Sequence, residues 1–265
     1  MIDIQSQQDH REIPIDLVGV SELRYPIVVL DRAREKQETV ATINMSVSLP
    51  HHFKGTHMSR FVEILTEHRG DMTMHTLPRI LHTLKERLDA ESARVEIQFP
   101  YFLKREAPAT GSTALMDYNC WFHGESNGTQ DDFVLGVQVP VTSLCPCSKA
   151  ISDYGAHNQR GTITLEVRTT RKADGEPNMI WIEELVDVAE SSASAPVYPL
   201  LKRADERHVT MQAYDNPVFV EDMVRNVTAA MQQDERVQWF KVHAVNMESI
   251  HNHNAFAKIE WKRPS

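Results

Sequence analysis

Cysteine is scarce in this chain, and its few positions already restrict what the protein can be. Only three cysteines occur, Cys120, Cys145 and Cys147. An odd, low number in a chain that begins without an apolar signal region argues against a disulfide framework. Cys145 and Cys147 are separated by one residue, which is too close for an easy bridge between them. Metal binding or a part in a chemical reaction is therefore the better explanation for this pair.

Long apolar runs and an excess of positive charge are also missing. No apolar run approaches the ~20 residues that a membrane-spanning helix needs, and the segment from Met1 to Pro14 is polar. The 28 basic residues are outnumbered by 37 acidic ones, which gives a net charge of −9. This balance argues against non-specific nucleic-acid binding, although a local basic pocket could still hold a small anion. We expect a cytoplasmic globular protein.

What is present is a repeated order of elements. Alternating Val, Ile and Thr positions and helical spacing of apolar residues predict strand–strand–helix–helix–strand–strand in each half. In the first half these segments are 18–31, 38–49, 58–68, 77–88, 93–103 and 113–122. In the second half they are 132–144, 161–169, 180–189, a helix that begins at Asn216 and Pro217, 237–245 and 255–261.

This order predicts an α+β protein whose antiparallel sheets carry their helices on one face. Two such halves indicate a duplicated domain, with residues 1–130 in the first copy and 131–265 in the second. We expect the boundary in the loop Gly124–Asp132. The polar Gly/Pro segment Arg171–Asn178 is expected to be a loop that tolerates insertion.

The densest group of reactive side chains lies in Leu144–Gly161, which reads LCPCSKAISDYGAHNQRG. A cysteine thiolate and the His157 imidazole are good ligands for a divalent ion such as zinc. A structural zinc site would need four ligands, so a Cys/His set completed by a carboxylate fits a catalytic metal with an open position. The alternative is that the cysteines are buried as small hydrophobic residues.

A second segment, Glu248–His253 (ESIHNH), carries a histidine pair. If this segment is a strand, His251 and His253 point to the same face, and Glu248 is close enough to orient one of them. They would form a general acid/base pair. The alternative is a solvated polar turn before the last strand.

Charged residues follow in Leu200–Thr210 (LLKRADERHVT). The default interpretation is a solvated face, and the functional one gives Glu206 a metal and Lys202 or Arg203 a phosphate. Glu221 lies beside an apolar helical stripe, where a carboxylate is usually a boundary residue. A carboxylate there is also well shaped to accept two parallel N–H bonds from a guanine edge.

In the first half, Lys54–Phe61 (KGTHMSRF) opens a helix. Free backbone N–H groups at a helix start bind anions, and Lys54, His57 and Arg60 would add positive charge. The alternative is that Thr56 simply caps the helix.

Taken together, KGTHMSRF, LCPCSKAISDYGAHNQRG, LLKRADERHVT, NPVFVEDMVR and ESIHNH closely resemble the GTP cyclohydrolase IB family, in order and over nearly the whole chain. The resemblance implies two tandem tunnelling folds (ββααββ) per chain and a homotetramer with active sites at subunit interfaces. It implies conversion of GTP to 7,8-dihydroneopterin triphosphate and formate, the first step of tetrahydrofolate biosynthesis. We expect no nucleic-acid or membrane partner, because acidic residues predominate and long apolar runs are missing.

The resemblance also implies roles for individual residues. The ligands of one divalent metal ion (zinc, manganese or iron(II)) would be Cys145, His157 and Glu206, with no organic cofactor. The catalytic residues would be Cys147, Glu248, His251 and His253. Glu221 would anchor guanine, and the candidates for the triphosphate are Lys149, Lys202, Arg203 and Arg60. Alternatives are a relative that forms a cyclic phosphate product from GTP, a non-catalytic purine- or pterin-binding module of the same fold, and a metal-buffering protein.

Overall fold

The computed structural model describes residues 5, 7–68, 72–128 and 130–264. The chain forms two compact units. Unit 1 comprises Met1–Pro100 and Trp121–Leu135, and unit 2 comprises Tyr101–Cys120 and Gly136–Ser265. The boundaries after residues 100, 120 and 135 each fall within a strand, so three strands contribute residues to both units. The division after residue 130 stays a prediction.

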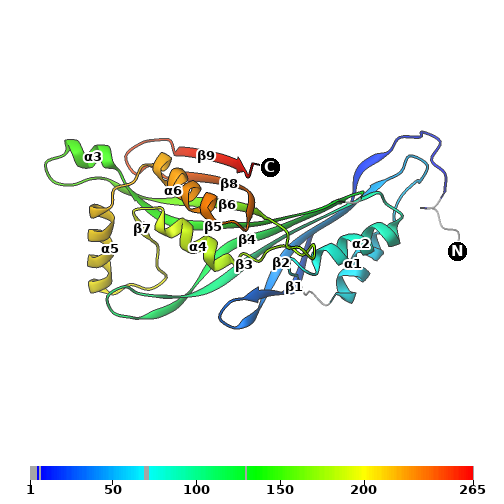
Figure 1. Cartoon of the computed structure of the whole chain (residues 1–265), viewed down its shortest axis with the longest axis horizontal. Helices are drawn as coiled ribbons and strands as arrows, with labels where there is room; N and C mark the ends of the chain where they lie inside the picture. The colour runs from blue at the N-terminus through cyan, green and yellow to red at the C-terminus, as the bar shows by residue number, and fades with distance from the viewer. Residues whose placement is uncertain (1–4, 6, 69–71, 129, 265) are drawn as a thin grey trace. The chain divides into compact units, whose positions relative to one another are not determined.

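The elements in chain order are β1 (Ile15–Asp31), β2 (Glu35–Leu49), α1 (Met58–Glu67), α2 (Leu77–Leu88), β3 (Ser92–Glu106), β4 (Thr113–Asn127), β5 (Gln130–Leu144), α3 (Pro146–Ile151), β6 (Asn158–Thr169), α4 (Ile182–Ser191), β7 (Ala195–Pro196), α5 (Arg203–Asp215), α6 (Val220–Gln233), β8 (Val237–Asn246) and β9 (Ala255–Lys262). The strands are hydrogen-bonded in the order β1-β2-β3-β4-β5-β6-β8-β9, and β7 pairs with β5. Figure 1 traces this path. The α+β class is confirmed.

Unit 1 is built on alternation along its strands. In β2 every second side chain from Ala41 to Leu49 is buried, as expected for a strand that packs one face on a core. Helix α1 turns Phe61, Ile64 and Leu65 toward this core, and α2 adds five apolar side chains from Leu77 to Leu88 at helical spacing. The two helices contact each other and the strands β1 and β2 (Figure 1).

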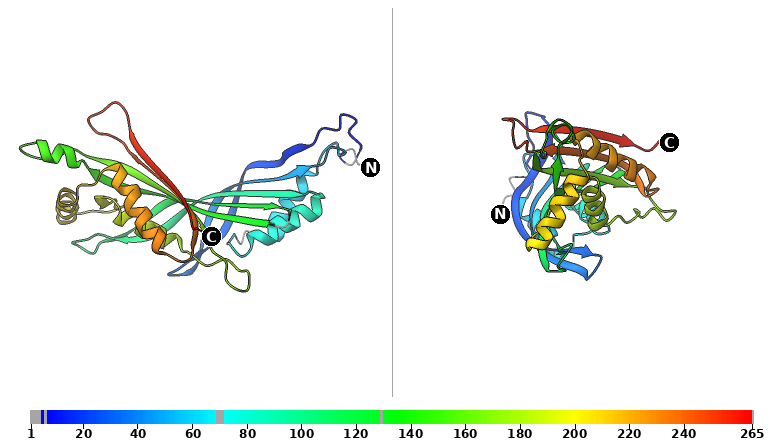
Figure 2. Two further views of the ribbon diagram at one scale, coloured as in Figure 1. Left: turned by 45° about the horizontal axis from the view of Figure 1, so that its top comes forward. Right: turned by 90° about the vertical axis from the view of Figure 1, so that its left-hand side faces the viewer.

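Unit 2 also packs helices on antiparallel strands. Strand β8 pairs antiparallel with β6, from Gly161↔Asn246 to Thr169↔Val237, and with the edge strand β9. Helices α4 and α6 contact each other, and they pack on β6, β8 and β9 (Figure 2, yellow-green and orange). The stripe predicted on the last helix is confirmed, since Val220, Met223, Val224, Val227 and Met231 of α6 are all buried.

The predicted start of that helix is wrong. Asn216 caps the end of α5, and α6 begins at Val220 with Phe219 as its N-cap residue. The reason is tertiary, because the Asn216 side chain donates hydrogen bonds to the carbonyls of Ala193 and Ser194, at 2.9 and 3.3 Å. The predicted boundary loop is also largely strand, since β4 extends to Asn127 and β5 begins at Gln130. Helices α3 and α5 and strand β7 are absent from the predicted order.

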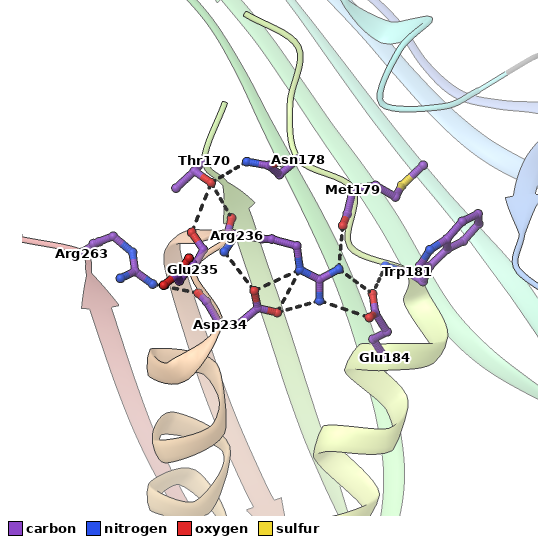
Figure 3. Close-up of polar contacts among 9 residues, drawn as sticks. All are labelled: Thr170, Asn178, Met179, Trp181, Glu184, Asp234, Glu235, Arg236 and Arg263. Carbon is purple, nitrogen blue, oxygen red and sulfur yellow. Dashed lines mark hydrogen bonds and ion pairs between the residues drawn. The ribbon is translucent and has the colours of Figure 1, made fainter. Parts of the chain in front are cut away.

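In unit 2, a cluster of polar contacts around Arg236 joins the turn after α6 to residues 179–184 (Figure 3). The Arg236 guanidinium binds Asp234 Oδ2 at 2.7 Å, Glu184 Oε1 at 3.1 Å and the Met179 carbonyl at 2.9 Å. It thereby fixes the turn after α6 to the first turn of α4. The hydrogen bonds from Arg236 hold the pKa of the Asp234 carboxyl below its usual value. The segment Arg171–Asn178, between β6 and α4, is a loop as predicted.

Within the described residues, no helix combines the length and the apolar character required to cross a membrane.

Candidate active site

A pocket of about 270 Å³ in unit 2 gathers most of the predicted site residues. It lies where β5 and β8 end and where α3, β6 and α6 begin. Seven residues from the sequence prediction line it: Cys145, Cys147, His157, Glu221, Glu248, His251 and His253. Ser143, Gln159, Phe219 and Asn246 line it as well. Residues from four separate segments of the sequence therefore meet at one point.

A short hydrogen-bonded loop places Cys145 beside His157. The Cys145 amide donates to the His157 carbonyl at 3.1 Å, and the His157 amide donates to Ser148 Oγ at 3.1 Å. Cys145 is the N-cap residue of α3, and its Sγ accepts a hydrogen bond from the Ser148 amide at 3.4 Å. The loop thus presents a sulfur and an imidazole together.

The three cysteines have different surroundings. Cys145 is half-buried and Cys147 is exposed, whereas Cys120 is buried in β4. Burial raises the pKa of the Cys120 thiol well above its usual value. The interpretation of the cysteines as buried hydrophobic residues therefore holds for Cys120 and not for the pair in the pocket.

Polar side chains surround the His157 ring. Its Nδ1 lies 2.7 Å from Gln159 Oε1 and 3.9 Å from Glu248 Oε2. The His251 ring lies edge-on to it, with ring centroids 6.4 Å apart, and His251 stacks on His253 at 5.1 Å. The two latter histidines are exposed and lie in the loop between β8 and β9. The segment is not a strand, and the alternative of an exposed polar turn before the last strand describes it, although both side chains reach the same pocket.

Glu221 occupies the first turn of α6 and is exposed, next to the buried Val220. A carboxylate in a first turn is stabilised by the free N–H groups and the dipole of the helix. Phe219, directly before the helix, is 38% exposed and also lines the pocket. The Glu221 carboxylate, which can accept hydrogen bonds from N–H groups, and the Phe219 ring therefore line the same side of the pocket.

The remaining predicted residues do not line this pocket. Glu206 is exposed on α5, and Lys202 and Arg203 lie at the start of that helix. Lys149 of α3 donates to the Tyr214 carbonyl, and its Nζ lies 4.2 Å from the centre of the Tyr214 ring. In the described part of the chain, no three His, Cys, Asp or Glu side chains are placed to hold a metal ion together.

In unit 1, Arg60 of α1 donates to the Arg87 carbonyl at 2.8 Å. Helix α1 begins at Met58, and its N-cap residue is His57, without a side-chain capping bond. The helix start predicted in Lys54–Phe61 is confirmed, but the cap by Thr56 is not.

Asp205, next to Glu206, has a structural role. It is fully buried and accepts hydrogen bonds from the amides of Lys202, Ala109 and Thr110 and from Thr110 Oγ1. Burial alone would raise the pKa of this carboxyl, but the four donors outweigh it and hold the pKa far below its usual value. Asp205 thus ties the start of α5 to the β3–β4 turn.

Among the polar residues that line the pocket, sequence reasoning missed three, Ser143, Gln159 and Asn246. Only Gln159 left a signal, because it lies two residues after His157 and residues two apart on a strand share a face. Ser143 and Asn246 are brought to the pocket by the pairing of strands that are distant in sequence.

Comparison with known proteins identifies the family of this chain. The model of the family described as type I GTP cyclohydrolase folE2 matches residues 1–257. GTP cyclohydrolase FolE2 of Geobacter sulfurreducens is 55% identical over 260 residues, which cover 98% of each chain. The FolE2 of Syntrophotalea carbinolica is 52% identical over 261 residues, covering 98% of this chain and 95% of that protein.

Solved structures add evidence on the fold. A uricase from Bacillus fastidious matches with a TM-score of 0.60 at 9% identity, covering 94% of this chain and 93% of that one. A uricase from Arthrobacter globiformis matches with a TM-score of 0.55 at 11% identity, covering 94% and 93%. At such identities the likeness shows a shared fold alone. By its sequence, the chain belongs to the type I GTP cyclohydrolase FolE2 family.

Proposed function

We propose that this protein hydrolyses GTP to 7,8-dihydroneopterin triphosphate and formate, in the first step of tetrahydrofolate biosynthesis. The observation that carries this proposal is the joining of Cys145 and His157 with Glu221 in one pocket. Family membership supports the same activity. The reaction consumes one water overall, because two waters open the imidazole ring and release formate, and one is lost when the new ring closes.

Glu221 would hold the base. Its carboxylate offers two oxygens to the N1–H and 2-amino groups of guanine, a pairing that is short and strong when the acceptor is charged. Held by this edge, the purine would turn C8 toward Cys145 and His157. Fixing the reacting carbon in this way lowers the entropic part of the barrier.

The donor set fits one divalent metal ion per site. Cys145 Sγ is supported by the Ser148 amide, and the His157 Nδ1 contact with Gln159 leaves the other ring nitrogen for ligation. A bound ion would supply a water whose pKa is lowered toward neutrality. We propose Glu206 of α5 as the third ligand and zinc, manganese or iron(II) as the ion. No organic cofactor is required.

Proton transfer would fall to the residues at the pocket mouth. His251 and His253 are exposed and stacked, so either can deliver a proton to N7 or to the leaving nitrogen. Glu248, near the His157 ring, would set the protonation of its neighbours. Cys147, exposed in the first turn of α3, would act beside the reacting carbon.

We further propose that each chain is a pair of tunnelling folds and that the protein is a homotetramer with active sites at subunit interfaces. The residues left outside the pocket support this view. Lys149, Lys202, Arg203 and Arg60 would meet the triphosphate, and Arg60, on α1 of unit 1, would serve the pocket of a neighbouring subunit.

The proposal is tested by incubating GTP with metal-loaded protein and measuring formate together with fluorescent oxidised neopterin. Cys145→Ala and Glu221→Ala serve as the variants. Formate and neopterin triphosphate, lost in both variants, are the expected result. Formate with a cyclic phosphate product would assign the protein to a related reaction. GTP binding without formate, with each of the three metals, would reject the enzyme in favour of a purine-binding module.

A further inference from the structure

Gln159 contacts His157 directly and is itself buried. It is the second residue of β6 and only 7% exposed. Its Oε1 lies 2.7 Å from His157 Nδ1, which is a good hydrogen-bond distance. An amide oxygen can only accept a hydrogen bond. The contact therefore requires the proton of a neutral His157 ring to sit on Nδ1.

The position of this proton decides what the ring can do. A neutral imidazole carries one N–H and one lone pair, and a proton on Nδ1 leaves the lone pair on Nε2. The opposite tautomer would present an N–H to a metal ion and could not bind it through Nε2. The tautomer of a ligand histidine is commonly set by the hydrogen bond at its second nitrogen.

Glu248 is the other polar side chain near this nitrogen, but its Oε2 lies 3.9 Å from Nδ1, which is too long for a hydrogen bond. Gln159 is thus the side chain at bonding distance. We propose that Gln159 is a positioning residue that holds His157 in the Nδ1–H tautomer, so that Nε2 is the nitrogen offered to the metal ion. The ligation part rests on the proposed function, whereas the tautomer part does not.

The first measurement reads the tautomer in metal-free protein. Two-bond ¹H–¹⁵N correlation spectra of ¹⁵N-histidine-labelled protein distinguish Nδ1–H from Nε2–H rings. The chain has 13 histidines, so the His157 signal is assigned by its loss in His157→Ala. The expected wild-type result is the Nδ1–H tautomer. An Nε2–H ring at His157 in the wild-type protein would overturn the proposal without any variant at Gln159.

The second measurement compares three substitutions by zinc affinity in competition with a chelator. Gln159→Met keeps the length of the side chain but removes the acceptor, so the Nδ1–H preference should disappear and affinity should fall roughly 10–100-fold. Gln159→Glu keeps the acceptor and should retain both the tautomer and, within a few-fold, the affinity. Thr164→Val, on the same strand, is the control and should change neither.

The outcomes separate the two proposals. A Gln159→Met protein with an unchanged tautomer and unchanged zinc affinity would overturn the role of Gln159. If wild-type His157 shows the Nδ1–H tautomer and Gln159→Met abolishes it, but zinc binds to neither protein, the role of Gln159 in setting the ring stands and the metal site of the proposed function fails.

Discussion

Asn246 on β8 donates a hydrogen bond from Nδ2 to Ser143 Oγ on β5, over 3.0 Å, although β6 lies between these strands. Gly161 of β6, which pairs with Asn246, makes this possible, since a Cβ there would lie 2.6 Å from Asn246 Oδ1. Ser143 in turn donates to the Val218 carbonyl at 2.9 Å. This relay fixes the residues just before α6, the helix that carries Glu221.

Gly161→Ala tests the relay. The added Cβ would also lie 3.0 Å from the Val245 carbonyl, so Asn246 must move and the bond to Ser143 should break. We expect the free energy of unfolding to fall by about 1–3 kcal/mol, measured by urea denaturation, and the KM for GTP to rise. Gly155→Ala is the matched control, because a Cβ at Gly155 meets nothing within 4 Å. Equal stability of the two variants would contradict the relay.

Glu221→Gln tests recognition of the base. The amide keeps the shape of the side chain but has one acceptor oxygen in place of two and carries no charge, so one guanine N–H should face an N–H of the protein. We expect kcat/KM for GTP to fall at least ~10²-fold, mostly through KM. Glu235→Gln, an exposed carboxylate in the turn after α6, controls for the loss of charge. A Glu221→Gln protein with wild-type KM would remove Glu221 from the guanine contact.

Asp205→Asn tests the buried carboxylate at the start of α5. The folded-state pKa of Asp205 is depressed, so its contribution to stability is complete above the unfolded-state pKa of about 3.9 and is lost as pH falls through the folded value. The variant should therefore be less stable than wild type near neutral pH, and this gap should narrow below about pH 4. Urea denaturation across this range measures it. A gap that widens in acid would refute the assigned sign.

Arg236→Gln tests the cluster shown in Figure 3. The substitution leaves Asp234 and Glu184 close together without the cation that both contact. The side chain of Arg236 is 37% exposed, so solvent screening limits the loss to about 1–2 kcal/mol of unfolding free energy. High salt should reduce the difference in unfolding free energy between the variant and the wild type. Arg225→Gln, which breaks a single exposed pair with Asp222, should cost much less.

The sequence was informative where structure is local. Alternation in β2 and the apolar stripe of α2 predicted those elements, because each packs one face on a core. Helix α5 gave no such signal, since Asp205 and Ala213 are its buried residues and the rest is polar. The start of α6 failed because Asn216 serves the carbonyls of Ala193 and Ser194, a role that depends on tertiary contacts.

The same division runs through the candidate site. Cys145 and His157 were predicted together because they belong to one short segment. The contact of Asn246 with Ser143 joins residues 103 positions apart and depends on strand order, which local patterns do not determine. Glu206 is a different case. The motif LLKRADERHVT, on which its predicted role rests, is present in the sequence, but its side chain does not line the pocket.

The closed loop between Cys145 and His157 has a consequence for the order of folding. Its ends are a dozen residues apart and are joined by a backbone hydrogen bond from Cys145 to His157, so bringing sulfur and imidazole together costs little chain entropy. The relay through Asn246 must await the pairing of β6 with β8, a long-range event that is slow in β-rich chains. The Cys145 sulfur and the His157 imidazole should therefore come together early in folding, and the side of the pocket that carries Glu221 should form last.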